Sequence, residues 1–416
     1  MLLIYRILIN VAFIFSPFIF LIRIIKKKEN NLSVKQKLGF ANHKRRKGRV
    51  IWFHGASVGE ILSVIPLIEK YEKSKIIDQI LITSNTLSSS KIIKNYNFKK
   101  ITHQFFPIDN QIIIKKFINY WQPSLALFID SEVWPNMLIY LNKKKIPSVL
   151  LNARITKKSF NRWIKFRKFS KLIFSKFEIC LSSNSESVNY LKKLGAKKIK
   201  YFGNLKYSQS ENEKINIDKR IISFFRKKRV WCASSTHFTE EKFAGLLHIE
   251  LKKKFKNLLT VIIPRHIHRE NEIKEQLIEL DLKVHTHSDK MKIDNDTDIY
   301  LVNTFGRTKF FYSIISNVFL GGSLIKHGGQ NPLEAIRYNC NVLHGPYIEN
   351  FDEIFTFLHN QKVADKITDL NQASIVLKRL LSSKKTKKNI KNKIKNIGEK
   401  ILNKNMSEIK SILNKV

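Results

Sequence analysis

Two features of this chain have residues suited to chemistry: a glutamate behind one predicted strand and a glycine-rich turn behind another. Glu60 follows the apolar run Val50–His54 through a loop of small residues, Gly-Ala-Ser-Val-Gly. A carboxylate there can act as a general base if a dry site raises its pKa. A lone glutamate in a first helical turn more often only complements the helix dipole. The other feature, Val318–Glu334, is an apolar strand that runs into two glycine pairs and a helix start.

The second glycine pair and the helix start behind it have the composition of an anion site. Gly328 and Gly329 let a ligand approach the backbone because they lack a Cβ. Asn331 is a good helix N-cap and Pro332 fits the first helical position, where free N–H groups attract phosphate. Glu334 in the first turn could hold a hydroxyl pair of a sugar. An ordinary strand–loop–helix turn is the alternative.

Further polar residues also follow predicted strands. Glu132 lies in the segment Asp130–Asn136 behind one strand, and Lys206 lies in the segment that closes the first half of the chain. Pro264 and Arg265 follow a strand of the second half, where a guanidinium can bind a phosphate through two hydrogen bonds. Because the carboxyl ends of parallel strands form the ligand-binding edge of an open sheet, these positions are the expected site.

Metal binding has one candidate in the sequence. The spacing Asp294-Asn-Asp296-Thr-Asp298 offers oxygen ligands, but it precedes a predicted strand, so we expect a solvated turn at the other edge of the sheet. We therefore expect neither a metal nor a cofactor, and expect protein side chains to supply the positive charges.

The elements that must position these residues alternate between short β-rich runs and amphipathic helical runs. This pattern predicts an α/β fold with right-handed βαβ units around parallel sheets. The polar segment Ser208–Asp218 is the best linker, so two Rossmann-like domains with a central cleft are expected. The predicted divisions are a membrane anchor (1–25), an acceptor domain (35–207), a donor domain (219–380) and a basic C-terminal helix (384–416). The predicted strands are Val50–His54, Gln79–Thr83, Ile101–Phe106, Leu125–Ile129, Ser148–Leu151, Glu178–Leu181, Val230–Ala233, Leu258–Ile263, Lys283–His285, Ile299–Asn303, Asn317–Leu320 and Asn341–His344.

The composition limits the partners of the protein. With 76 Lys and Arg against 33 Asp and Glu the net charge is +43, which fits nucleic acid, an anionic membrane or an anionic substrate. The charge is spread along the whole chain and lacks an Arg-rich arm, an aromatic RNA-binding signature or zinc-finger spacing, so we do not expect nucleic-acid binding. Cys180, Cys232 and Cys340 are far apart, which indicates a reducing compartment and buried thiols.

The N-terminal run Leu2–Ile25 is almost entirely apolar and is followed by three lysines. About 20 apolar residues can span a bilayer, and the basic cluster would keep the following domains cytoplasmic. A cleaved signal peptide is disfavoured because no small-x-small site follows the run. Arg6 and Pro17 leave open a helix that lies in the membrane interface instead of spanning it. We expect a membrane-anchor helix.

Several segments, in this order, are similar to those of the 3-deoxy-D-manno-octulosonic acid (Kdo) transferases of lipopolysaccharide synthesis. They read WFHGASVGE, SEVWPN, NARITKKS, GNLKY, ASSTHFTEE, IPRH, LGGSLIKHGGQNPLE and HGPYIENF, and they span roughly residues 50–352. The resemblance implies a B-type glycosyltransferase fold, CMP-Kdo as donor and the lipid A precursor (lipid IVA) as acceptor. It also implies work at the cytoplasmic face of the inner membrane.

The resemblance implies a role for each matching residue. Glu60 would deprotonate the acceptor hydroxyl, and Glu132 and Lys206 would support the transition state. The CMP pocket would consist of Pro264, Arg265, Gly306, Arg307, Thr308, Asn331, Pro332, Leu333 and Glu334. The family usually has an acidic residue where this chain has Arg307, so donor binding is altered if that carboxylate makes a contact. The pair Lys326-His327 is also less typical of the family than its surroundings.

The chemistry of the residues agrees with an inverting transfer, because one base and a stabilised leaving phosphate suffice for a single displacement. Two other functions compete with it. One is another B-type glycosyltransferase that uses a uridine-diphosphate sugar and a lipid-linked acceptor. The other is a basic, non-enzymatic protein that binds nucleic acid or membranes, which would leave the carboxylates at two strand ends unexplained.

Overall fold

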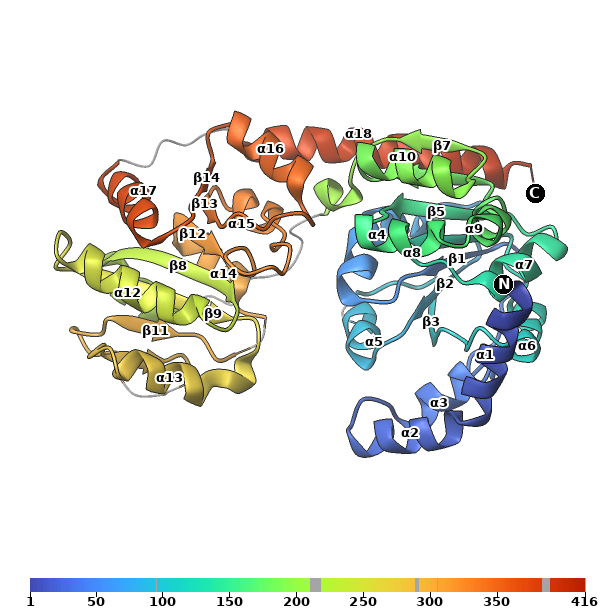
Figure 1. Ribbon diagram of the computed structural model, residues 1–416, viewed down its shortest axis with the longest axis horizontal. Coiled ribbons are helices and arrows are strands. Elements are labelled where there is room, and N and C mark those ends of the chain that lie inside the picture. Colours follow the sequence, from blue (N-terminus) through green and yellow to red (C-terminus); the bar gives the residue numbers. More distant parts are fainter. Residues whose placement is uncertain (95, 210–217, 289–291, 305, 384–389, 416) are drawn as a thin grey trace. The chain divides into compact units, whose positions relative to one another are not determined.

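The computed structural model (Figure 1) describes residues 1–94, 96–209, 218–288, 292–304, 306–383 and 390–415. The chain forms two compact units, one of Met1–Ser210 with Lys395–Val416 and one of Glu211–Ile394. Each unit contains a parallel seven-stranded sheet with helices around it. This confirms the predicted α/β class with two Rossmann-like domains. The central cleft and the domain limits stay predictions.

The sheet of the first unit has the order β3-β2-β1-β4-β5-β6-β7. Its central strands are apolar runs buried on both faces, as parallel sheets require. The order changes direction between β1 and β4, where Ile51 pairs with Leu125. The strands are β1 Val50–His54, β2 Gln79–Ser84, β3 Ile101–Phe105, β4 Leu125–Ile129, β5 Ser148–Ala153, β6 Ile179–Ser182 and β7 Ile199–Tyr201.

Helices cover both faces of this sheet. Its helices are α4 Val58–Glu72, α5 Leu87–Lys94, α6 Gln111–Trp121, α7 Pro135–Lys143, α8 Lys157–Ile164, α9 Arg167–Phe174 and α10 Ser185–Leu194. Helix α4 contacts α5, whereas α6, α7, α9 and α10 contact one another in turn. These four helices close a core around the large buried side chains of Trp52, Phe117, Trp121 and Phe128. The apolar faces of the helices therefore hold the strand ends in fixed positions.

The second unit repeats the architecture with the order β10-β11-β9-β8-β12-β13-β14. Its strands are β8 Arg229–Thr236, β9 Leu258–Pro264, β10 Val284–Thr286, β11 Ile299–Leu301, β12 Asn317–Leu320, β13 Asn341–His344 and β14 Ala364–Lys366. Its helices are α11 Lys219–Arg226, α12 Glu240–Lys252, η2 Ile267–Arg269, α13 Glu270–Ile278, α14 Thr308–Ile314, α15 Leu333–Arg337, α16 Asp352–Asn360 and α17 Leu370–Ser382. Here the order changes direction between β8 and β12. The short edge strands β7 and β14 were not predicted.

The C-terminal helix α18, Ile390–Leu413, contributes its residues from Lys395 onward to the first unit. It packs against the 3-10 helix η1, Leu205–Ser208. A Cβ on Gly398 would lie 2.3 Å from the carbonyl oxygen of Tyr207, so only glycine allows this approach. The predicted tail helix is thus α18, although 384–389 and 416, and most of the predicted linker, lie outside the described residues.

The N-terminal segment forms α1 Leu2–Ile14, α2 Ser16–Ile25 and α3 Asn31–Lys37. The expected single anchor helix is therefore wrong in form, since α1 and α2 meet at a bend of 54°. Pro17 lies in the first turn of α2, where its missing N–H is tolerated, and it cannot continue the α1 hydrogen-bond ladder. Among the described residues no single helix has the length and apolar character to cross a membrane; taken together, the bent pair does.

Candidate active site

Glu60 lies in the first turn of α4, at the carboxyl edge of the first sheet. Ser57 caps this helix, and its hydroxyl donates to Glu60 Oε1 at 3.0 Å. The N–H of Ala56 donates to Glu60 Oε2 at 2.6 Å. The tight loop before it needs Gly55, whose Cβ would lie 3.1 Å from Glu60 Cβ. The small-residue loop thus holds the carboxylate in one orientation while leaving it half-buried.

The surroundings of Glu60 favour its protonated form. Burial raises the pKa of its carboxyl to about 7, and the negative charges of Asp130 and Glu132 add to that effect. The hydrogen bonds from Ala56 and Ser57 oppose it only in part. A carboxyl with a pKa near neutrality can accept a proton and release it again at physiological pH, which is what a general base requires.

Glu132 follows β4, the strand beside β1, and its surroundings have the opposite effect on its charge. Burial raises its pKa, but the hydrogen bond and charge of His54 and the indole N–H of Trp134 outweigh burial and hold the pKa below its usual value. His54 Nε2 lies 3.0 Å from Glu132 Oε2, and Trp134 Nε1 donates to the same oxygen at 2.9 Å. His54 is fully buried and stacks on Phe106 with ring centroids 3.7 Å apart. Glu132 is therefore the carboxylate that stays ionised.

A chain of amide contacts brings Lys206 to the same edge. Asp130 directly follows β4 and Asn152 is the last residue but one of β5, both with left-handed backbones (φ 56° and 54°), and Asn152 Nδ2 donates to Asp130 Oδ1 at 2.6 Å. Asn152 Oδ1 in turn accepts the N–H of Leu205 at 2.8 Å, and the Asn204 side chain accepts the N–H of Lys206 at 3.0 Å. Helix η1, which carries Lys206, also packs against α4. The structure thus gathers Glu60, Glu132 and Lys206 at one sheet edge.

In the second unit, the predicted CMP-pocket residues follow three strands that end at one edge. Pro264 ends β9, and the exposed Arg265 donates its N–H to the carbonyl of Thr236 on β8 at 2.9 Å. Gly306, Arg307 and Thr308 lie between β11 and α14, and Gly306 has φ 77° with open space beside it. Asn331, Pro332, Leu333 and Glu334 lie between β12 and the body of α15.

The predicted helix start differs in detail. Pro332 is the N-cap and not the first helical residue, and α15 has only 5 residues. Asn331 Oδ1 accepts the N–H of Leu333 at 3.2 Å, so one of the free donors is already used. The contribution of this helix dipole to anion binding is accordingly smaller than the sequence suggested.

Glu240 accepts the backbone N–H groups of Gly322 and the two residues after it, a contact that sequence reasoning missed. Its carboxylate is 1 % exposed and accepts from the N–H of Gly322 at 2.7 Å, Ser323 at 3.2 Å and Leu324 at 3.1 Å. The N–H of His237 donates to it at 2.9 Å. The loop behind β12 is therefore fixed by a protein carboxylate, and this part of the glycine-rich turn serves the fold.

A histidine cluster at the same edge was also missed. The ring of His237 lies 4.3 Å from that of His327 and 5.7 Å from that of His266, which lies 5.6 Å from His268. Burial lowers the pKa of His237 to about 4, and the positive charges of its histidine and arginine neighbours add to the shift. The signal was present in the sequence: His237, His266 and His327 each follow one of the three central strands β8, β9 and β12.

The metal candidate forms the expected exposed turn at Asp294 and Asp296, but its last aspartate does not face solvent. Asp298 is buried, and its Oδ1 lies 3.2 Å from His248 Nε2, while Asp296 pairs with Lys283. Within the described ranges, the structure contains no group of three His, Cys, Asp or Glu side chains arranged to hold a metal ion.

Comparison with known proteins identifies the family. Residues 32–209 match the family model described as 3-Deoxy-D-manno-octulosonic-acid transferase (kdotransferase). The 3-deoxy-D-manno-octulosonic acid transferase of Rickettsia bellii is 32% identical over 377 residues, which cover 89% of each chain. The enzyme of the same name from Haemophilus influenzae is 28% identical over 367 residues, covering 87% of this chain and 85% of that one.

A solved structure supports the fold. A glycosyltransferase from Rickettsia africae superposes with a TM-score of 0.57 at 14% identity, covering 88% of this chain and 99% of that one. At this identity the likeness concerns the fold alone, and it agrees with the B-type glycosyltransferase architecture. The sequence matches extend further, through both units. The chain belongs to the family of 3-deoxy-D-manno-octulosonic acid transferases.

Proposed function

We propose that this protein transfers Kdo from CMP-Kdo to the lipid A precursor lipid IVA, with inversion at the anomeric carbon and without a metal. The observation that carries the proposal is the pair of carboxyls at adjacent strand ends, Glu60 with its pKa at about 7 and Glu132 with its pKa lowered. Carboxyls whose surroundings push their pKa values apart take different roles in acid–base chemistry.

In the proposed reaction, Glu60 accepts the proton of an acceptor hydroxyl. The hydroxyl oxygen then forms a bond to the anomeric carbon of Kdo. The bond from that carbon to the CMP phosphate breaks, and CMP leaves with the electron pair. Attack and departure occur on opposite faces, so the configuration inverts. Glu132, held ionised by His54 and Trp134, would stabilise the positive charge that develops on the sugar.

The positive charges of the proposed mechanism come from Lys206 and Arg265. CMP-Kdo carries a phosphate and a sugar carboxylate, and guanidinium and ammonium groups bind such anions. We assign CMP binding to the carboxyl edge of the second sheet, with Arg265, the Gly306–Thr308 segment and Asn331–Glu334. Arg307 adds a positive charge in a segment where the resemblance implies an acidic residue.

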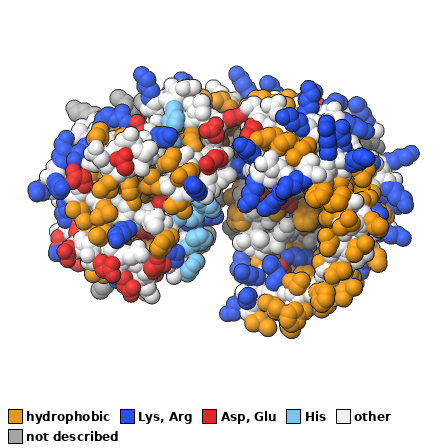
Figure 2. Space-filling view, viewed as in Figure 1, with side chains coloured by type: hydrophobic (Ala, Val, Ile, Leu, Met, Phe, Trp, Pro, Cys, Tyr) orange, Lys and Arg blue, Asp and Glu red, His pale blue; other side chains and the backbone are white. Residues whose placement is uncertain are grey.

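The lipid acceptor calls for work at a membrane, and the N-terminal helices support an interfacial anchor. Polar side chains fix α1 to the body of the first unit: the hydroxyl of Tyr5 donates to Asp109 at 2.6 Å, and Arg6 Nε donates to Asn136 at 3.1 Å. The other face exposes a set of large apolar side chains, visible over α1 and α2 in Figure 2, that includes Leu3, Leu8, Ile14, Phe15, Phe18, Leu21 and Ile25. We therefore propose that the pair lies flat in the cytoplasmic face of the inner membrane.

The placement of the anchor is tested by finding on which side of the membrane its N-terminal end is exposed. A peptide tag before Met1 should be cut by protease from the cytoplasmic side of inverted inner-membrane vesicles, because a flat helix pair keeps both its ends on that side. Protection of the tag in intact inverted vesicles, with cleavage only after detergent, would mean that the pair spans the bilayer.

The function is tested by transfer from CMP-Kdo to tetraacylated, bisphosphorylated lipid IVA in reconstituted membranes. The native chain should form product, and Glu60→Gln should lose roughly 10²–10⁴-fold in kcat with CMP binding intact. Glu69→Gln on the same helix is the matched control. Undiminished transfer by Glu60→Gln would remove Glu60 as the base, and absence of product from the folded native chain would favour the uridine-diphosphate-sugar transferase.

A further inference from the structure

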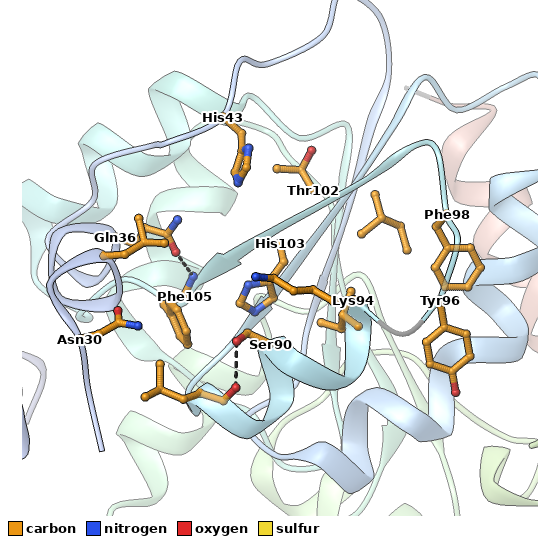
Figure 3. Close-up of a pocket in the computed structure, with 14 residues that line it drawn as sticks. Asn30, Gln36, His43, Ser90, Lys94, Tyr96, Phe98, Thr102, His103 and Phe105 are labelled. Carbon is orange, nitrogen blue, oxygen red and sulfur yellow. Dashed lines mark hydrogen bonds between the residues drawn. The ribbon is translucent and has the colours of Figure 1, made fainter. Parts of the chain in front are cut away.

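A cavity of about 440 Å³ lies in the first unit along β3, the edge strand of its sheet (Figure 3). Helices α3 and α5 and the turn that carries Tyr96 and Phe98 form its other walls. The volume falls within the roughly 300–1,000 Å³ of small-molecule sites. Glu60, Glu132 and Lys206 are not among its lining residues, so the cavity is distinct from the candidate active site.

The walls of this cavity offer apolar contact, because polar groups below its rim bond to protein. Gln36 Oε1 accepts the N–H of Phe105 at 2.9 Å, which covers the open edge of the sheet. Ser90 Oγ donates to the carbonyl of Leu87 at 2.8 Å, a bond drawn in Figure 3. Tyr96 and Phe98 stack with their ring centroids 5.3 Å apart and present flat apolar faces. A hydrocarbon would therefore bind here without separating polar groups from their partners.

One positive charge, that of Lys94, lies at the rim of the cavity over a neutral interior. Lys94 and His43 line it and are exposed, whereas His103 projects inward from β3. His103 Nε2 lies 2.9 Å from Ser84 Oγ. Burial lowers the pKa of His103 to about 4, with further lowering by Lys94 and His43, so this imidazole is neutral at physiological pH. An apolar interior below the positive charge of Lys94 fits a hydrocarbon chain that belongs to an anionic molecule.

The cavity is connected to the candidate active site and to the proposed anchor. The N–H of Asn85, in the loop that leads into α5, donates to the carbonyl of Ala56 in the Glu60 loop at 3.4 Å. Helix α5 also contacts α4, which carries Glu60. At the other wall, Leu32 of α3 lines the cavity with its side chain 45 % exposed, a few residues after α2. A lipid whose head group reaches Glu60 would thus find the cavity nearby, in the same part of the first unit.

We propose that this cavity binds one acyl chain of the lipid acceptor. The inference rests on the proposed function, since it names how the lipid part of that acceptor is recognised. The apolar walls would select for chain length, because each buried methylene changes affinity by roughly fourfold. Lys94 at the rim would attract a phosphate of the same lipid.

The matched variants are Ser90→Phe, which fills the cavity from α5, and Ser88→Phe, which places the same ring on an exposed position of that helix. Ser90→Phe should raise the KM for a tetraacylated acceptor by about tenfold or more. It should leave the KM for CMP-Kdo and the kcat/KM for a deacylated acceptor unchanged, and Ser88→Phe should match the native chain throughout. Leu87→Phe, a second lining position, should repeat the effect if Ser90→Phe proves poorly folded.

Chain length provides a second readout. In the native chain the KM should vary with acyl length, and Ser90→Phe should flatten this dependence. Equal KM values for Ser90→Phe and Ser88→Phe, with the same length dependence, would overturn the proposal. A rise in KM that is equal for acylated and deacylated acceptors would also overturn it, because the loss would then not depend on the acyl chains of the acceptor.

Failure of the proposed function is separable from failure of the cavity. If the native chain transfers no Kdo, binding of a fluorescent dodecanoate to the full chain in detergent decides the question for the cavity. Affinity that is equal for the native chain and Ser88→Phe, and about tenfold weaker for Ser90→Phe, would support an acyl-chain site. Equal affinity in all three chains would overturn it.

Discussion

Glu60 and Glu240 occupy corresponding positions in the two units, and their surroundings differ. Each lies at the start of the helix that follows the first strand of its sheet, where the strand order changes direction. Glu60 accepts two hydrogen bonds and faces the charges of Asp130 and Glu132. Glu240 accepts four backbone N–H bonds and is almost fully buried.

The comparison shows that the donors around a carboxylate, more than its place in the fold, decide its role. Four N–H groups compensate the burial of Glu240, so it can act as a fixed link between β8 and the loop behind β12. Glu60 is buried with fewer donors and beside negative charges, so its ionised form is strained and its proton is exchangeable near neutrality. We therefore propose that the first unit carries out proton transfer and that the second provides a rigid edge for anion binding.

The largest expected effect on the fold is that of Glu240→Ala. The substitution leaves four N–H groups without their acceptor, and each unsatisfied buried donor costs about 1–3 kcal/mol. We expect the free energy of unfolding of the second unit to fall by roughly 4 kcal/mol, with faster hydrogen exchange at the amides of Gly322, Ser323 and Leu324. Glu275→Ala, an exposed position on α13 of the same unit, should change it by less than about 0.5 kcal/mol. A loss of under about 1 kcal/mol for Glu240→Ala would mean that water replaces the carboxylate.

Glu60→Gln should stabilise the protein instead of destabilising it, and the size of the gain should depend on pH. The folded chain keeps the Glu60 proton up to pH about 7, whereas an unfolded chain releases it around the ordinary value of 4.5. Stability should therefore fall as the pH rises between these values and stay at its lower level above them, by roughly 3 kcal/mol in total. Glu60→Gln should equal the native chain near pH 4.5 and exceed it at pH 8 in urea unfolding.

The control for this effect is Glu69→Gln on the same helix, which should leave the difference between the two pH values unchanged. If the stability difference between the native chain and Glu60→Gln were the same at both pH values, the raised pKa of Glu60 would be contradicted. The catalytic loss and the stability gain from one substitution would together distinguish a strained functional carboxylate from a structural one.

The sequence predicted the architecture well because apolar strand runs and small-residue loops are local signals. The core strands and the positions of Glu60, Glu132 and Arg265 behind them could be derived without the structure. The partners of those residues could not, since the contact of His54 with Glu132 joins residues 78 positions apart. The same holds for Glu240 and the Gly322 loop, 82 positions apart, where the backbone N–H groups leave no trace in the sequence. The bend between α1 and α2 was signalled by Pro17, but we predicted one helix.

His54→Phe should shift the pH dependence of catalysis. Phenylalanine keeps the stack on Phe106 but removes the partner that holds Glu132 ionised. The pKa of Glu132 should rise, its average charge near Glu60 should fall, and the pKa of Glu60 should follow downward by roughly half a unit. The acid limb of the kcat/KM profile should then move to lower pH.

Trp134→Phe tests the same network more gently, because it removes one neutral donor and no positive charge. Its acid limb should move in the same direction by a smaller amount. If the acid limb stays in place in both variants, the charge of Glu132 does not affect the pKa of Glu60. Burial would then be the main cause of the raised pKa of Glu60.

The smallest expected effect concerns the histidine cluster of the second unit. Its imidazoles repel one another's protons, as the lowered pKa of His237 indicates, and Arg265 and Arg269 add to that repulsion. A bound anion would offset this repulsion, so CMP binding should take up protons and tighten as the pH falls from 8 to 6. Calorimetric titration in two buffers of different ionisation enthalpy measures that uptake directly.

His237→Gln should weaken CMP binding about two- to threefold at pH 6 and leave it unchanged at pH 8, because a bound anion would raise the lowered pKa of this ring and only its protonated form contributes. His285→Gln, on β10 of the same unit, is the control and should keep the native pH dependence. If His237→Gln and the native chain take up the same number of protons, the histidines only pack together. Anion binding at this edge would then depend on arginine and backbone N–H groups, whose charge does not change in this range, and proton exchange would be confined to the first unit.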